Sequence, residues 1–140
     1  MSAKFVFTGL DELKAALRSL PADLVGESAH IIEAAANGAG VTIRGNYGSH
    51  RRTGNLQDHV VVEKKAAGRF GVNYVVKSTA RHATLFEHGT QARHWSSGKS
   101  TGVMPPFHAF VPVVIRKRRE MYEQLRGVLT RAGLQVSGEP

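Results

Sequence analysis

Apolar residues recur at spacings of three and four in three parts of the chain: residues 10–20, about 22–43, and 107–132. This spacing places apolar side chains on one face of an α-helix, so we expect a helix in each part. Pro21 separates the first helix from the second, because proline ends or bends a helix. The second segment is rich in alanine, which would let a neighbouring element approach closely.

The segment 107–132 carries the strongest helical pattern of the chain. Pro112 is tolerated only in a first turn, so the regular helix should begin near Val111. Gly133 should end it. We expect the apolar face of this helix to enter the core beside a strand. The residues predicted to be buried together are Val114, Met121, Leu125 and Phe70.

Strands are predicted where apolar residues alternate with others, at residues 4–7, 56–65 and 69–77. The last two are joined by residues 66–68, a three-residue link that contains glycine. Such a link is typical of an antiparallel hairpin. Residues 46–55 are predicted to be a loop, because glycine, asparagine and serine are turn formers.

These elements together indicate the α+β class. We expect a small antiparallel sheet, made of the hairpin and the N-terminal strand, packed by long helices that include a long C-terminal helix. The length of 140 residues fits a single domain over 1–140. The polar segment of about 91–104 has little to bury and is predicted to be a flexible loop, and about 134–140 a tail.

The stretch 81–90 lies between the strand-rich and helix-rich parts. It places apolar Leu85 and Phe86 beside the carboxylate of Glu87. Gly89 is a natural end point for a short helical turn or strand, since glycine tolerates positive φ. We therefore expect one side of this stretch to face the core.

Charge changes the range of partners to consider. Nineteen Lys and Arg against eleven Asp and Glu give a net charge of +8 and a pI near 10.3. Such a surplus favours nucleic acid, anionic lipid or an acidic protein surface. There is no cysteine, so disulfide and thiolate chemistry are excluded. No apolar run approaches the roughly 20 residues that cross a bilayer, so we expect no membrane contact.

Two motifs resemble chemical sites without their required spacing. His82, Glu87 and His88 follow the pattern His-x-x-x-x-Glu-His, whereas zinc hydrolases need His-Glu-x-x-His or His-x-x-Glu-His. Residues 97–100, Ser-Gly-Lys-Ser, lack the glycine five positions before Gly-Lys that a phosphate loop needs, and no helix follows. We therefore nominate no catalytic residue, metal ligand or cofactor.

A basic cluster, Arg116-Lys117-Arg118-Arg119, lies within the predicted C-terminal helix. Four consecutive helical residues span most of the circumference, so at least two must face outward. With Arg81, Arg93 and Lys99 the cluster could form a band that contacts phosphates. The other interpretation is a solvated face, or one that pairs with acidic residues of a neighbour, and the residues leave both open.

Four short motifs occur in one order along the chain. They are Gly9-Leu10-Asp11-Glu12-Leu13 followed by Leu20-Pro21, then Arg52-Thr53-Gly54-Asn55-Leu56, then Ala83-x-x-Phe86-Glu87-His88-Gly89-Thr90, then Pro106-Phe107 with Pro112. In this respect the chain resembles the small neck or tail-completion proteins of long-tailed bacteriophages, the family that includes the lambda-type minor tail protein Z. The resemblance covers about residues 5–130. His88 stands where that family usually has an aromatic residue.

The resemblance implies a structural virion protein rather than an enzyme. Members assemble as rings at the head–tail junction, so we expect a homo-oligomeric, hexameric ring in the virion neck, made in the host cytoplasm. Its neighbours would be connector, tail-terminator or tail-tube proteins, and packaged DNA would pass through it. Candidate assembly residues are Arg52, Thr53, Gly54, Glu87, Gly89, Thr90, Arg118 and Arg119, and candidate DNA-channel contacts are Arg93 and Lys99.

Two other functions stay open at this point. A basic DNA-binding module would use the C-terminal helix and would bind duplex DNA with a steep dependence on salt. A metal hydrolase would place its ion at His82, Glu87 and His88, and would carry stoichiometric metal.

Overall fold

The computed structural model describes residues 22–50, 52–66 and 72–135. The strand predicted at 4–7 and the helix predicted at 10–20 lie outside these residues, as do Phe70 and most of the tail. The described part belongs to the α+β class, as predicted. It combines long helices, including a long C-terminal one, with a two-stranded antiparallel sheet and a further short hairpin.

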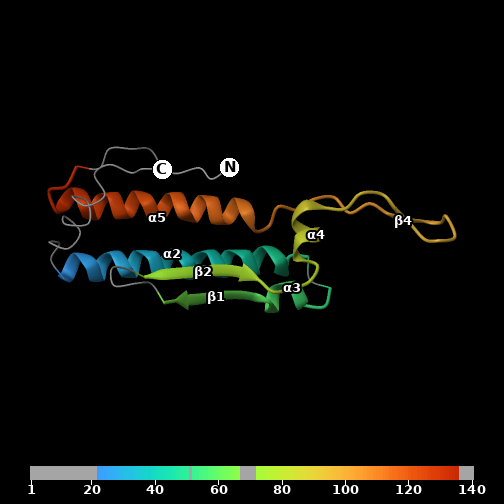
Figure 1. Ribbon diagram of the computed structural model, residues 1–140, viewed down its shortest axis with the longest axis horizontal. Helices are drawn as coiled ribbons and strands as arrows, with labels where there is room; N and C mark the ends of the chain where they lie inside the picture. The colour runs from blue at the N-terminus through green and yellow to red at the C-terminus, as the bar shows by residue number, and fades with distance from the viewer. Residues whose placement is uncertain (1–21, 51, 67–71, 136–140) are drawn as a thin grey trace, which may run out of the picture.

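Two long helices run antiparallel and side by side (Figure 1). They are α2, Ala22–Gly48, and α5, Val111–Arg131. An ion pair between Glu27 of α2 and Arg131 of α5 ties the start of one to the end of the other. The sheet lies on another side of α2, which therefore contacts both α5 and the strands.

The sheet consists of β1, Val60–Lys65, and β2, Asn73–Ser78. The register pairs Val60 with Ser78 and Lys65 with Asn73. On its outer face Glu63 accepts hydrogen bonds from Lys65 and Lys77, each at 2.7 Å, and these bonds lower the pKa of Glu63 to about 2. Two strands alone are at best marginally stable, so the sheet depends on its packing against α2.

Small residues let the sheet approach α2 closely. A Cβ added to Gly40 would lie 2.6 Å from Cγ2 of Val62 in β1. Arg44, one turn later, donates a hydrogen bond from Nη2 to the carbonyl oxygen of Val60 at 2.8 Å. Gly40 thus sits at a helix–sheet contact, which explains a glycine in the middle of a helix.

The described ranges also contain four short elements: α3, Asn55–Asp58; α4, Ala83–His88; β3, Arg93–His94; and β4, Ser100–Gly102. The core lies at the end of the molecule where α3, α4, the start of β1 and the start of α5 meet the end of α2. Its buried residues are Ala39, Ile43, Tyr47, Val60, Phe86, Ala109 and Val113.

The bounds of α5 confirm the prediction from local signals. The helix begins at Val111 with Pro112 in its first turn, and it ends at Arg131. Gly133 follows with a φ of 81°, in the left-handed region that glycine enters without strain. The antiparallel hairpin is confirmed as well.

Two predicted boundaries are wrong. Helix α2 continues to Gly48 instead of ending near Ile43, so residues 46–48 are not a loop. Burial explains this extension, because Tyr47 is only 2% exposed and Asn46 donates a hydrogen bond to the carbonyl oxygen of Ala109. The strand predicted at 56–65 begins at Val60, because the residues before it form α3.

The predicted core face of α5 is also partly wrong. Val114, Met121 and Leu125 are half-buried, whereas the buried residues of this helix are Val113 and Val128. The reason is that α5 packs mainly on α2, and a groove stays open beside Val114 and Met121. None of the helices in the described ranges is long and apolar enough to cross a membrane.

Replacing glycine with alanine at two positions of α2 should have opposite effects on the stability of the protein. Gly45→Ala, with nothing within 4 Å of the new Cβ, should stabilise the protein by about 0.5–1 kcal/mol, because alanine restricts the unfolded chain and favours helix. Gly40→Ala should destabilise it, because Val62 must move. Urea unfolding of both variants measures the difference, and equal shifts would contradict the close contact with β1.

Candidate functional site

The motif Phe86-Glu87-His88-Gly89-Thr90 forms the end of α4 and the residues that leave it. The helix ends at Gly89, as predicted, with a φ of 75°. Phe86 and Glu87 are buried and His88 is exposed. The buried side of the motif faces the segment that leads into α5, and the contacts between the two are the best-defined polar site in the described structure.

Glu87 caps a helix that lies 23 residues further along the chain. Its Oε2 accepts a hydrogen bond from the backbone N–H of Phe110, and its Oε1 from that of Val111, both at 2.9 Å. The first N–H groups of a helix have no acceptor within the helix, and α5 has no capping side chain of its own. A carboxylate there is also favoured by the helix dipole. Glu87, which is 5% exposed, supplies the missing cap.

Gly89 and Thr90 hold the same segment by its backbone. A Cβ on Gly89 would lie 2.6 Å from the carbonyl oxygen of Met104 and 2.9 Å from the nitrogen of Pro106, so only glycine fits. The N–H of Thr90 donates to the carbonyl oxygen of Met104 at 2.9 Å, and the N–H of Met104 donates to Oγ1 of Thr90 at 3.0 Å. We call residues 86–90 with residues 104–111 the clamp.

Aromatic rings fill the inner side of the clamp. Phe86 stacks on Phe107 with ring centres 4.6 Å apart, and His50 lies 4.6 Å from Phe107. Tyr47, from the last turn of α2, meets the edge of Phe86 at 5.5 Å. Burial raises the pKa of Tyr47, and the negative charge of Glu87 raises it further. The clamp is therefore fastened to α2 by packing and by the hydrogen bond from Asn46 to Ala109, and it holds the start of α5 through the bonds to Glu87.

The second predicted contact loop lies at the same end of the molecule, before α3 (Figure 1). Arg52 and Thr53 are exposed, whereas Gly54 is buried with a φ of 81° and precedes the first helical residue. Oγ1 of Thr53 accepts a hydrogen bond from the N–H of Asn55 at 3.4 Å. Arg52 and Thr53 are thus free to meet a partner, and Gly54 shapes the turn.

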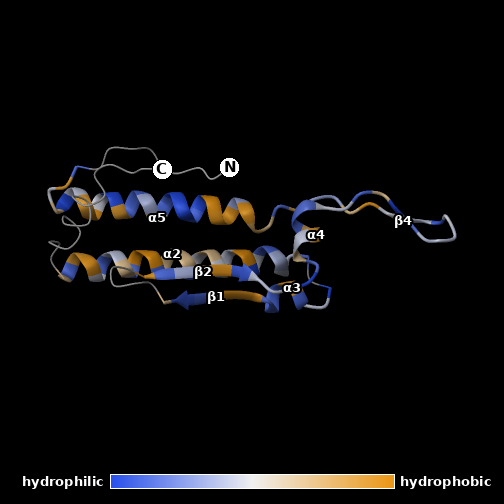
Figure 2. Cartoon of the chain, viewed as in Figure 1, coloured by the Kyte–Doolittle hydropathy of each residue, from blue (hydrophilic) through white to orange (hydrophobic). Residues whose placement is uncertain are grey.

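The basic cluster of α5 points largely outward, as predicted. Arg116, Arg118 and Arg119 are exposed, and Lys117 is half-buried and pairs with Glu120 at 2.8 Å. Arg118 donates hydrogen bonds to the hydroxyl of Tyr122 and lies over its ring at 5.5 Å. Figure 2 shows the same region as the most hydrophilic part of α5.

Arg93 and Lys99 do not join this cluster. They belong to the β3–β4 hairpin, which projects beyond the end of the molecule where α5 begins (Figure 1). The interpretation in which all of these basic residues form a single phosphate-contacting band is therefore wrong. The segment of about 91–104, predicted to be a flexible loop, contains a short hairpin, with Arg93 paired to Gly102 and His94 to Ser100.

The predicted alternative site at His82, Glu87 and His88 has no metal-binding geometry. His82 and His88 are exposed, while Glu87 is buried with both oxygens bonded to backbone amides. Across residues 22–50, 52–66 and 72–135, no three His, Asp or Glu side chains lie close enough to hold a metal ion. Glu87 positions a helix and has no oxygen to spare for a ligand.

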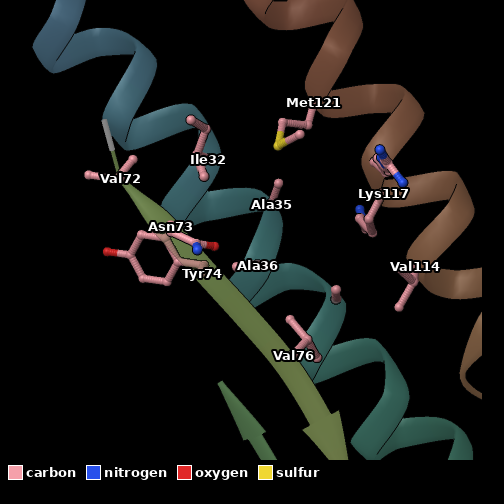
Figure 3. A pocket seen from close by; sticks show the side chains of 12 residues that line it. Ile32, Ala35, Ala36, Val72, Asn73, Tyr74, Val76, Val114, Lys117 and Met121 are labelled. Atoms are coloured by element: carbon pink, nitrogen blue, oxygen red, sulfur yellow. The ribbon is translucent and has the colours of Figure 1, made fainter. Parts of the chain in front are cut away.

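The sequence did not reveal an open groove between α2, β2 and α5 (Figure 3). Its volume is about 520 Å³. Apolar residues of α2 and β2 line its floor, and Lys117 and Arg118 lie on the α5 side. The alanine-rich face of α2, which in the sequence predicts a closely packed neighbour, lines part of this groove.

Removal of the carboxylate charge should loosen α5. Glu87→Gln replaces one acceptor with an N–H₂ donor that faces a backbone N–H, so stability should fall by roughly 1–3 kcal/mol. Glu123→Gln makes the same change at an exposed position of α5 and should shift stability by less than about 0.5 kcal/mol. Chemical unfolding of both variants tests the cap, and a Glu87→Gln chain as stable as the control would refute it.

Because the backbone approaches Gly89 closely, replacing it with alanine should destabilise the protein more than the same change at Gly133, which also has a positive φ. Gly89→Ala adds both the strain of a left-handed alanine and a clash with backbone, whereas Gly133→Ala, with φ 81° and nothing within 4 Å, adds only the strain. We expect Gly89→Ala to cost about 1–3 kcal/mol more than Gly133→Ala in thermal or urea unfolding. Equal losses would mean that the clamp backbone is looser than described.

The clamp and its surroundings offer contacts rather than reactive groups. The carboxylate of Glu87 is occupied by amides, and the exposed residues are Arg52 and Thr53 before α3, the arginines of α5, and the hairpin residues Arg93 and Lys99. These groups can bind anions or a protein surface. Comparisons with protein-family models, curated proteins and solved structures found no match.

Proposed function

We propose that this chain is a structural protein of the neck of a long-tailed bacteriophage, and that it acts by ring assembly at the head–tail junction. One observation carries the proposal. The two later motifs of the resemblance, Phe86–Thr90 and Pro106–Phe107 with Pro112, are separate in sequence but meet in the clamp. In this chain, residues of these two motifs hold the start of α5 in place.

An exposed stripe on α5 supports assembly through this helix. Val111 is 43% exposed, Ile115 56% and Tyr122 39%. At 100° per residue these three side chains lie within about 40° of one another around the helix, on the side away from Val113 and Val128. Apolar residues gathered on one exposed face are typical of a surface that meets a partner. We call Val111, Ile115, Arg118 and Tyr122 the α5 stripe.

Arg118 gives the α5 stripe the composition of a subunit interface. Arginine and tyrosine are enriched at protein interfaces, and here the guanidinium of Arg118 is already held on the ring of Tyr122. With Arg119 it would pair with carboxylates across the subunit boundary, which sets orientation more than affinity. The neighbours would be further copies, or the connector, tail-terminator and tail-tube proteins, around a channel for packaged DNA.

A basic DNA-binding module is the second candidate. The observation that favours it is that Arg116 and Arg119 are exposed and the whole chain carries a net charge of +8. This function predicts that a monomer or dimer binds duplex DNA through α5, with a salt dependence set by these arginines. The two functions differ in oligomeric state and in what α5 contacts.

An acidic residue in the α5 stripe should prevent assembly. Ile115→Glu places a charge where an apolar contact is proposed, so rings should be lost while the folded subunit keeps its thermal stability. Val41→Glu is the matched control, because Val41 is 66% exposed on α2, outside the stripe. Size-exclusion chromatography with light scattering, on the chain alone and in reconstituted necks, gives the measurement.

The charge reversal Arg118→Glu with Arg119→Glu separates the two functions. Loss of the ring or of tail joining, with duplex binding by the isolated protein unaltered, supports assembly through α5. Normal assembly with a collapse of DNA affinity would replace the neck protein with the DNA-binding module. Normal rings in the Ile115→Glu chain would reject the α5 stripe as the interface.

A further inference from the structure

The β3–β4 hairpin projects from the body as an arm (Figure 1). We call residues 91–103 the arm, and every one of them is exposed. Trp95 is 65% and Val103 63% exposed, so the arm gains little from burial within the chain. The indole of Trp95, which combines an apolar ring with an N–H donor, is therefore available to a partner.

The arm is nevertheless a defined structure. The N–H of Trp95 donates to the carbonyl oxygen of Lys99, and the N–H of Gly98 donates to that of Trp95, both at 2.8 Å. Oγ1 of Thr101 donates to the carbonyl oxygen of Arg93 at 3.0 Å. Its base is fixed by the clamp, because residues 90 and 104 are bonded to each other. The two ends of the arm are therefore held together where it leaves the body.

The positively charged arm contains no acidic residue. From residue 88 to residue 119 the chain contains no Asp or Glu but six Lys and Arg, two of which, Arg93 and Lys99, lie on the arm. The carboxylate just before this stretch, Glu87, is buried and bonded to amides. A positively charged projection without carboxylates favours an anionic partner.

The side chains of the arm suit nucleic acid better than a protein surface. Arginine, lysine, serine and threonine are the common donors to phosphate oxygens, and the hydroxyls of Ser96 and Ser97 make no hydrogen bond within the described residues. A hairpin that docks on a protein would carry alternate apolar residues, and here only Trp95 and Val103 are large and apolar. Strands of two and three residues are also too short for edge-to-edge pairing.

We propose that the arm binds duplex DNA, with Arg93 and Lys99 on the phosphates and Trp95 against the groove between them. A two-stranded ribbon fits a DNA groove, and an indole in the groove can pack against sugars and base edges. This inference deepens the proposed function, since it names the element that meets DNA in the channel, and it rests on that function only for the source of the DNA. It assigns DNA to the arm and leaves the α5 stripe to subunit contacts.

The chain contains a single tryptophan, and it lies on the arm, so its fluorescence reports the arm alone. The probe is a mixed-sequence 30-base-pair duplex added to the full-length protein at several salt concentrations. We expect the Trp95 emission to change with the same midpoint as the anisotropy of a labelled duplex. Arg93→Ala with Lys99→Ala should lower the slope of log Kd against log salt by about two units. Trp95→Ala should bind the duplex more weakly than the unmodified chain, and Trp95→Phe, which keeps an aromatic ring, should retain more of the affinity.

Arg116→Ala with Arg119→Ala is the matched control, because it removes the same charge from exposed positions of α5. The inference is overturned if this control lowers the salt slope as much as the arm variant does, or if Trp95 emission is unchanged at saturating duplex. It is also overturned if Trp95→Ala disrupts rings and leaves DNA affinity intact, since the arm then binds protein. Because DNA binding and ring formation are measured separately, failure here leaves the neck assignment standing.

Discussion

The buried carboxylate of Glu87 accepts hydrogen bonds from the amides of Phe110 and Val111, and these bonds hold the start of α5 against α4. Bonds to a charged acceptor contribute about 1.5–3 kcal/mol each, which offsets the cost of burying the charge. Without them α5 would begin with unpaired N–H groups beside the core. The same contact positions the start of α5, so the proposed assembly surface, the α5 stripe, depends on this side chain.

The clamp also decides where the arm leaves the body. Because Gly89 has no side chain, the backbone of residues 104–106 can pack directly against it. Thr90 accepts a hydrogen bond from Met104 through its hydroxyl and donates one through its N–H, and these two bonds hold the ends of residues 91–103 together. A projection of that length would otherwise sample many directions. Fixing its base makes it usable as a contact element. The clamp therefore connects the start of α5 to the base of the arm.

Local signals in the sequence predicted the elements that depend on local chemistry. Pro112 and Gly133 mark the ends of α5, and Gly89 ends α4, because each acts through its own backbone. The role of Glu87 could not be predicted, since its partners are 23 and 24 residues away. The extension of α2 was missed for the same reason: the burial of Tyr47 against Phe86 outweighs the glycines around it. The arm gave no apolar pattern, because it buries almost nothing.

Amide hydrogen exchange tests residue by residue whether Glu87 caps α5. The N–H groups of Phe110 and Val111 have no acceptor in the helix, so any strong protection must come from the carboxylate. We predict that both amides exchange nearly as slowly as the middle of α5, and that Glu87→Gln speeds their exchange far more than that of the helix middle. Rapid exchange of Phe110 and Val111 in the unmodified chain would contradict the account.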